Sequence, residues 1–215
     1  RVHHTASKVS IVWWWSSMLP GEISLAHGWV LFFDELPEFP RQVLDVLRQP
    51  LEDREITISR AQWKVNYPAD FMFIAAMNPC VCGFFKDPQK ECTCSSNEIK
   101  RYQSKISWPL LDRFDMILEV PRMELQELLV WTQTATHSYT DWIIKAREIQ
   151  RERYKTTSYV MNTQLHGTDL KKYAWLSEKA ESFLLENARA YTLSPRVVHK
   201  LIRVARTISD THNEK

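Results

Sequence analysis

Two adjacent carboxylates offer the clearest chemistry in the sequence. Asp34 and Glu35 directly follow a run of four apolar residues, Val30–Phe33. Such a run predicts a strand buried on both faces of a parallel sheet, with the acids at its carboxyl end. At such a place an Asp can bind Mg²⁺ directly or through water, and a neighbouring Glu can orient or deprotonate a water molecule. The alternative is a strand that ends in solvated acids, which the pair alone does not exclude.

A second apolar run favours the chemical reading. Phe71–Ala76 predicts another buried strand, and Asn78 follows it, just before Pro79. Ligands bind outside the carboxyl ends of parallel strands, so the Asn78 amide could help to hold a water molecule near the acids. An apolar strand that ends in Asp-Glu is the Walker B arrangement of P-loop ATPases. An Asn before Pro is otherwise an ordinary turn former.

The four cysteines form two close pairs at positions 80, 82, 92 and 94. In a cytoplasmic protein, two such pairs around a loop suggest a tetrahedral structural zinc site at Cys80, Cys82, Cys92 and Cys94. The usual spacing is Cys-x-x-Cys, so these Cys-x-Cys pairs match less closely, and free thiols or disulfides stay open as alternatives. The metal would stabilise the loop and take no part in catalysis.

Basic residues near the tip of a predicted β-hairpin suit nucleic-acid phosphates. Two alternating runs, Ile56–Arg60 and Lys64–Tyr67, predict this hairpin. Arg60 and Lys64 lie near its tip, where cations could contact phosphates. A solvated edge hairpin guarded by charge is the alternative.

Arginines further along the chain could either bind an anion or stay in solvent. Arg113 lies between Asp112 and Asp115, and it could be held out for an external anion or could pair with its neighbours. Arg196 falls in the first turn of a predicted last helix, which Ser194 would cap and Pro195 would start. Later arginines of this helix are expected to be solvated: Arg203 and Arg206.

The predicted elements divide the chain near residue 122. The first part holds the two strands and the hairpin, a helix from Arg41 to about Glu52, a helix around Ile99–Ile106, and a third strand at Met116–Val120. The second part is all helical, with helices at 123–135 and 140–154, one helix or a pair at 169–190, and a last helix from Pro195. We therefore expect an α/β part followed by a helical part.

Composition is that of a soluble globular protein. The chain has 215 residues, 44% hydrophobic and 25% charged, and a formal net charge of +2. Its apolar runs fall short of the roughly 18 residues of a membrane span, so no membrane partner is expected. The start, Arg1–Thr5, has neither an initial Met nor a signal-peptide pattern. We expect a cytoplasmic piece of a longer protein.

Taken together, the motifs resemble the Mg-chelatase-like ATPases of the ComM/YifB type, within the AAA+ superfamily. The resemblance covers nearly the whole chain and is weakest at 123–190. It rests on Pro20–His27, Val30–Phe39, Val46–Asp53, Ile58–Ala61, Asn78–Cys80, Pro109–Arg113, Leu193–Arg196 and Arg203–Ile208. It implies an α/β fold: the later part of a P-loop AAA+ core at 1–121, then a C-terminal helical lid domain with further helices at 122–215.

The resemblance also implies a role for each site residue. Asp34 and Glu35 become the Walker B pair, with Asp34 at the magnesium ion. Asn78 becomes sensor 1. Arg113 resembles the arginine finger that reaches the nucleotide of a neighbouring subunit, and Arg196 resembles sensor 2 of the lid.

The function implied by the resemblance is an ATP-hydrolysing motor that acts on DNA. It would use ATP and Mg²⁺, work as a homohexamer in branch migration linked to competence, and grip DNA with the hairpin at 55–67. The Walker A loop is expected upstream of Arg1, so this chain alone should bind ATP poorly. Two alternatives stay open: a magnesium-chelatase motor subunit, and a non-catalytic interaction module stapled by zinc.

Tryptophan stands at positions where such ATPases carry glycine. The chain has 4 Gly and 9 Trp, although ordinary usage of ~7% would give about 15 glycines. Six tryptophans stand at these glycine positions: Trp13, Trp14, Trp15, Trp29, Trp63 and Trp108. Glycine permits the positive φ that turns often need, which tryptophan does not. Our hypothesis is that the source reads UGA as glycine; a genuinely Trp-rich copy is the alternative.

Overall fold

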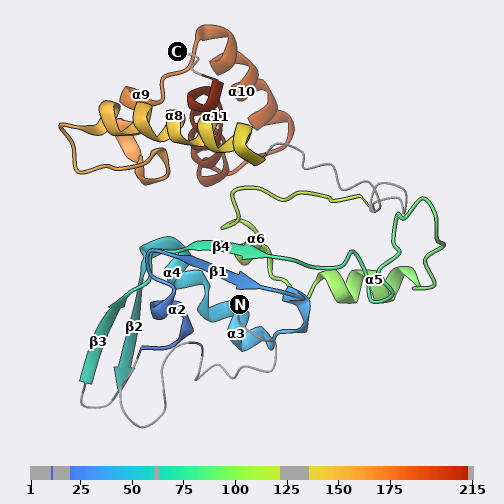
Figure 1. Ribbon diagram of the computed structural model, residues 1–215. Coiled ribbons are helices and arrows are strands. Elements are labelled where there is room, and N and C mark those ends of the chain that lie inside the picture. Colours follow the sequence, from blue (N-terminus) through green and yellow to red (C-terminus); the bar gives the residue numbers. More distant parts are fainter. Residues whose placement is uncertain (1–10, 12–19, 61–62, 122–135, 213–215) are drawn as a thin grey trace. The chain divides into compact units, whose positions relative to one another are not determined.

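The computed structural model describes Ile11 and residues 20–60, 63–121 and 136–212 (Figure 1). The chain forms two compact units, Arg1–Arg122 and Met123–Lys215, which are described one after the other. Within the described ranges, no helix combines the length and the apolar character needed to cross a membrane.

A pair of parallel strands lies at the centre of the first unit. β1 (Val30–Phe33) and β4 (Met72–Ala75) match the two apolar runs, and their register aligns Val30 with Met72 and Phe33 with Ala75. The expectation that both faces of β1 are buried is wrong for the described residues. Leu31 and Phe33 are buried, whereas Val30 is half exposed. Side chains alternate between the faces of a strand, so a sheet packed on one face leaves the other open.

The buried face of this sheet packs against aromatic and aliphatic side chains. The Phe33 ring stacks on Phe39 with 4.4 Å between ring centroids, and it meets Phe73 edge-on at 5.4 Å. The core also includes Ile23 of α2 (Glu22–Leu25) and Leu36 of the 3₁₀ turn η1 (Leu36–Glu38). Burial of these side chains anchors the end of β1, and with it the acidic pair.

The predicted helix at 41–52 forms as two short helices. α3 (Arg41–Val46) and α4 (Arg48–Asp53) meet at Leu47. Pro50 explains the break, because proline has no N–H and its ring clashes with the preceding turn inside a helix. Starting a new helix at Arg48 places Pro50 in a first turn, where backbone N–H groups have no intrahelical partner.

The hairpin prediction is confirmed. β2 (Glu55–Arg60) and β3 (Trp63–Pro68) pair antiparallel, from Glu55 opposite Pro68 to Arg60 opposite Trp63. The two strands extend away from the β1–β4 sheet (Figure 1). Ile56, Ile58 and Tyr67 belong to the core or pack against it. The apolar alternation therefore ties one face of the hairpin to the unit.

The chain after β4 has a long stretch without helix or strand, and then two short helices. α5 (Ser96–Gln103) begins earlier than predicted, because Ser95 caps it: the Glu98 N–H donates to the Ser95 hydroxyl at 3.3 Å, and the Ser95 N–H donates to the Glu98 carboxylate at 2.8 Å. α6 (Trp108–Leu111) follows, with Leu110 fully buried.

The third predicted strand, at 116–120, is wrong. These residues form neither helix nor strand, and Met116, Ile117, Leu118 and Val120 are exposed. A strand exists only when a neighbour pairs with its backbone groups. In the described part of this unit β1 pairs with β4 and β2 pairs with β3, and the backbone at 116–120 joins neither pair.

The second unit consists of helices. It contains α8 (Thr136–Tyr154), the 3₁₀ turn η2 (Asn162–Gln164), α9 (Gly167–Tyr173), α10 (Glu178–Ala190) and α11 (Pro195–His212). The predicted region 169–190 is thus a pair of helices, and the prediction at 123–135 lies outside the described residues. Ser194 caps α11 as expected, since its hydroxyl accepts from the Val197 N–H at 3.3 Å.

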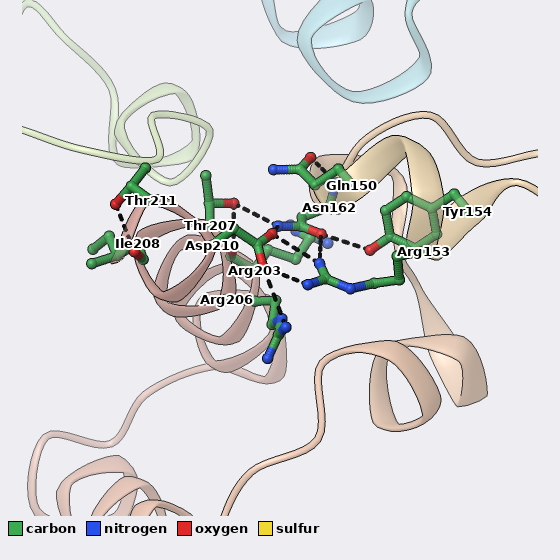
Figure 2. Close-up of polar contacts among 10 residues, drawn as sticks. All are labelled: Gln150, Arg153, Tyr154, Asn162, Arg203, Arg206, Thr207, Ile208, Asp210 and Thr211. Carbon is green, nitrogen blue, oxygen red and sulfur yellow. Dashed lines mark hydrogen bonds and ion pairs between the residues drawn. The ribbon is translucent and has the colours of Figure 1, made fainter. Parts of the chain in front are cut away.

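A small apolar cluster and a buried polar network hold these helices together. The apolar cluster centres on Tyr154 and Leu165 and is completed by Leu170 and Ala174. The polar network links α8, η2 and α11 around Asp210, whose side chain is buried (Figure 2). Figure 2 shows guanidinium groups converging on this carboxylate from two helices.

The tryptophans at glycine positions are partly described. Trp29 and Trp108 are 76% and 79% exposed, so large apolar rings stand in solvent. Neither is among the described non-glycine residues with positive φ, so the backbone does not demand glycine at these two positions. Trp63 is the first residue of β3. The hairpin turn at 61–62 and the three tryptophans at 13–15 lie outside the described residues.

Candidate functional site

The acidic pair stands where β1 ends. Backbone pairing continues past the strands, because the Ala76 N–H donates to the Phe33 carbonyl at 2.9 Å and the Leu36 N–H donates to the Ala76 carbonyl at 2.9 Å. Asp34 is half-buried and Glu35 is exposed. Hydrogen bonds on both sides therefore hold the two acids at the edge of the sheet where β4 also ends.

Glu35 adopts a left-handed backbone conformation, with φ 52° and ψ 49°. Such a conformation is uncommon for a residue with a side chain and costs on the order of 1–3 kcal/mol. The Glu35 N–H donates to the Asp34 carboxylate at 3.0 Å. The surrounding backbone bonds thus impose a strained turn, and residues in strained conformations cluster at functional sites.

Asn78 follows β4 and is exposed. Its backbone lies near the buried Tyr102 of α5 and partly offsets the rise in the pKa of that hydroxyl. Burial, and then the carboxylates of Glu38 and Glu35, raise the pKa of Tyr102 above its ordinary value. The acids, the Asn78 backbone and Tyr102 therefore belong to one neighbourhood.

Tyr102 was missed by the sequence reasoning. Its only signal was its place three residues after Ile99, because residues three apart lie on the same face of a helix. Both side chains are buried. The spacing could have predicted the burial but not which strand end the hydroxyl would contact.

Arg113 lies elsewhere in this unit and is bound to its own chain. Its side chain is 13% exposed and pairs with the Glu52 carboxylate of α4. The Nε donates to the Arg48 carbonyl at 3.0 Å, and an Nη donates to the Pro109 carbonyl. The sequence left two alternatives for Arg113, an external anion or a partner within the chain, and these contacts agree with the second. Its partner is a distant acid and not the adjacent aspartates.

The basic residues of the hairpin lie close to its tip. Lys64 is exposed, and the register sets it opposite Ser59, which is also exposed. Asn66, two residues on, is exposed on the same face of β3. Arg60 is the last residue of β2 and pairs with Trp63. A polar surface with a cation therefore lies near the tip.

The arginines of α11 differ from one another. Arg196 is exposed in the first turn and belongs to the second unit. Arg203 and Arg206 were expected to be solvated, and this is wrong. An Arg203 Nη donates to the Leu165 carbonyl at 3.2 Å, while Arg206 is only 14% exposed and pairs with Asp210 at 3.2 Å. The amphipathic pattern does not reveal a buried acid on the same helix one turn later.

The four cysteines form one cluster. The Sγ atom of Cys80 lies 3.4 Å from that of Cys82 and 3.7 Å from that of Cys92, and the Cys82 and Cys92 sulfurs are 3.5 Å apart. All four sulfurs, including that of Cys94, lie within 4.8 Å of one another. None is in a disulfide. The structure thus brings together every residue of the predicted zinc site.

The cysteine cluster favours a negative charge at one sulfur and opposes further charges. A hydrogen bond with the Phe84 backbone is the largest influence on Cys82 and lowers the pKa of its thiol to about 5. A backbone hydrogen bond with Cys94 lowers that of Cys92, but burial and the thiols of Cys82 and Cys80 outweigh it and raise the pKa of Cys92 to about 12. Like charges crowded together need a cation before all can ionise.

Comparison with known proteins relates this site to a family. The family model described as magnesium chelatase, subunit ChlI matches residues 1–128, and that of its C-terminal part matches residues 133–215. The chain is 40% identical over 216 aligned residues to competence protein ComM of Haemophilus influenzae, covering 99% of this chain and 41% of that protein. It is 39% and 38% identical to the YifB proteins of Salmonella typhimurium and Escherichia coli, covering 97% of this chain and 40% of each.

The chain thus spans about two fifths of the length of these relatives. Both ATP and Mg²⁺ are implied by the family, and the half-buried Asp34 oxygen atoms at the end of β1 suit Mg²⁺, which prefers carboxylate and water oxygens. The match to both family models and the identity over almost the entire chain establish the kinship. The chain belongs to the ComM/YifB group of the magnesium-chelatase-like AAA+ family.

Proposed function

We propose that the protein is an ATP-hydrolysing motor that acts on DNA, and that this chain supplies its Walker B and sensor residues. The observation that carries the proposal is the acidic pair at the end of β1, with Glu35 in a strained turn beside the end of β4. A catalytic group gains most when its position is set before the substrate arrives. A related protein is named a competence protein, which supports work on DNA.

Each site residue has a role in this proposal. Asp34 would hold Mg²⁺, which when bound would neutralise charge on the phosphates. Glu35 would orient the attacking water and accept its proton. The Asn78 amide would hold that water on its other side, while the hydrogen bond from Gln103 to the Pro79 carbonyl steadies the backbone next to Asn78. Arg196, an exposed residue of the second unit, would serve as sensor 2.

Arg113 would act in a neighbouring subunit of a homohexamer. Its pairing with Glu52 then describes a resting arrangement of one chain. To reach another subunit's nucleotide, the guanidinium would exchange the Glu52 carboxylate for a phosphate, and both are anions that arginine binds through two N–H groups.

Hydrolysis is tested in the full-length protein with the variant Glu35→Gln. ATP turnover is measured with and without DNA for this variant, the wild type and Glu119→Gln. Glu119 is an exposed acid outside the helices and strands and serves as a matched control. We expect DNA to stimulate the wild type and the control, and Glu35→Gln to lose turnover by about 10²–10⁴-fold, as for loss of a general base. Unchanged turnover in Glu35→Gln would refute the catalytic assignment.

DNA contact is tested at the hairpin. Lys64→Ala should weaken DNA binding and lower the salt dependence by about one counterion, while Lys100→Ala, an exposed lysine of α5, should not. Equal effects of the two variants would mean that the hairpin has no special part in binding DNA.

A magnesium-chelatase motor subunit is the second candidate, because the matching family model carries that description. It would hydrolyse ATP without stimulation by DNA and would support metal insertion into a tetrapyrrole together with a partner enzyme. The same turnover assay separates the two, since it compares rates with and without DNA. A non-catalytic module would show no turnover in either condition.

A further inference from the structure

The segment between β4 and α5 has little to hold it in place. Residues 79–95 form neither helix nor strand, and most of their side chains are exposed or half-buried. Its contacts include short-range ones: the Asp87 carboxylate accepts from the Gln89 N–H at 2.8 Å, and Lys90 lies over the Phe84 ring at 4.0 Å. Such contacts contribute little against the entropy of ordering a loop this long.

The sulfur spacing fits a single tetrahedral metal ion. Four thiolates about 2.3 Å from one Zn²⁺ stand about 3.8 Å apart at tetrahedral angles. The measured separations between Cys80, Cys82 and Cys92 are 3.4, 3.5 and 3.7 Å. A disulfide needs about 2.05 Å between sulfurs, so the cluster is too wide for one and compact enough for one ion.

The chemistry of the four ligands selects zinc. Four soft thiolates in a tetrahedron bind Zn²⁺ well and exclude Mg²⁺ and Ca²⁺, which take oxygen ligands. All four positions are filled by protein, as in structural zinc sites, with no place left for a reacting water. The ligands come in pairs from the two ends of the segment, so one ion closes the loop between Cys80 and Cys94.

The closed loop adjoins the end of β4. Cys80 is fully buried and follows Asn78 by two residues. The Gln103 Nε2 of α5 donates to the carbonyl of Pro79, the residue directly after Asn78, at 3.0 Å. On the other side, Cys94 immediately precedes the capping residue Ser95 of α5. The cysteine cluster therefore connects the Asn78 backbone to the start of the helix that supports it.

We propose that Cys80, Cys82, Cys92 and Cys94 bind one structural Zn²⁺, and that this ion positions the Asn78 backbone by joining the end of β4 to α5. The first part stands on the sulfur geometry alone. The second part, a positioning role beside the acidic pair, rests on the proposed ATPase function.

Metal content tests the first part. The chain is purified from cells supplied with zinc, and zinc per chain is measured for the wild type, Cys92→Ser and Glu91→Gln, an exposed neighbour that serves as control. We expect one zinc per chain in the wild type and control, and loss of it in Cys92→Ser. Cobalt exchanged for zinc should give the absorption of a tetrahedral thiolate complex. A folded wild-type chain that holds neither zinc nor cobalt would overturn the proposal, even if Cys92→Ser failed to fold.

Hydrogen exchange tests the positioning role without using ATPase activity. Removing zinc with a chelator should raise the exchange rate of amides around Asn78–Cys80 and in α5 by at least about tenfold, while β2 and β3 keep their rates. Unchanged exchange around Asn78 on loss of a bound zinc would refute the positioning role and leave the metal site standing. In the full-length protein, Cys92→Ser should lower kcat for ATP more than it changes KM.

Discussion

Removing the Asp210 carboxylate should strongly destabilise the helical unit. Its side chain is buried and accepts hydrogen bonds from Arg153 at 2.8 Å and from Asn162 at 2.8 Å, and Arg206 lies 3.2 Å away (Figure 2). Asp210→Ala would leave two guanidiniums, each 13–14% exposed, without their anion. Breaking a buried ion pair from one side costs about 3–5 kcal/mol. We expect the free energy of unfolding of this unit to fall by that amount.

Native-state hydrogen exchange measures this loss in the unit itself. The chain has two units, so a single denaturation curve would mix their transitions. Protection of amides in α8 and α11 should fall by about two to four orders of magnitude in Asp210→Ala, since every 1.4 kcal/mol is tenfold. Asp141→Ala, an exposed acid of α8, is the control and should change stability by less than about 0.5 kcal/mol.

Asp210→Asn separates charge from shape. The amide keeps the size and one carbonyl acceptor but cannot neutralise Arg153 and Arg206, so we expect a smaller loss than with alanine. If Asp210→Ala loses less than about 1 kcal/mol while α11 stays helical, the network does not hold the unit together. The reasoning from buried charges would then be refuted.

The same carboxylate makes the unit sensitive to acid. Burial by itself raises its pKa, but hydrogen bonds from Arg153 and Asn162 and the charges of Arg153 and Arg206 outweigh this and hold the pKa of Asp210 below its ordinary value. A depressed folded-state pKa contributes stability above the unfolded pKa of about 3.9, and this contribution is lost as pH falls through the folded value. Protection in α11 should therefore decline below about pH 4 in the wild type and decline less in Asp210→Asn.

Three further outcomes can be checked. Ser95→Ala should destabilise α5 by about 1 kcal/mol, which faster amide exchange in its first turn would measure. An unchanged exchange rate would show that the Ser95 cap does not stabilise the helix. Glu35→Gly should relieve the left-handed strain, so that stability is kept or rises by up to about 1 kcal/mol while hydrolysis is lost; a clear loss of stability on thermal denaturation would contradict the strain. Peptides of the natively expressed protein that span Trp29 and Trp108 should carry glycine masses, and tryptophan masses there would exclude UGA recoding.

The sequence by itself was enough for the features that depend on local patterns. Apolar runs located β1 and β4, alternation located the hairpin, and Ser194 with Pro195 located the start of α11. These succeed because strand burial, alternation and capping act between residues close in sequence. The motif order was specific enough to identify the family, which the comparisons confirm.

Tertiary structure alone decided which distant groups meet. An apolar run at 116–120 looked like a strand, but a strand needs a partner that no local pattern supplies. Arg206 looked solvated until the fold placed it against buried Asp210, which Arg153 reaches from another helix. The cysteine spacing suggested a metal site, whereas only the folded loop brings four sulfurs within 4.8 Å. The Asp34–Glu35 pair lies between these cases: the sequence located its strand end, and the backbone bonds to Ala76 and the left-handed turn at Glu35 came from the fold.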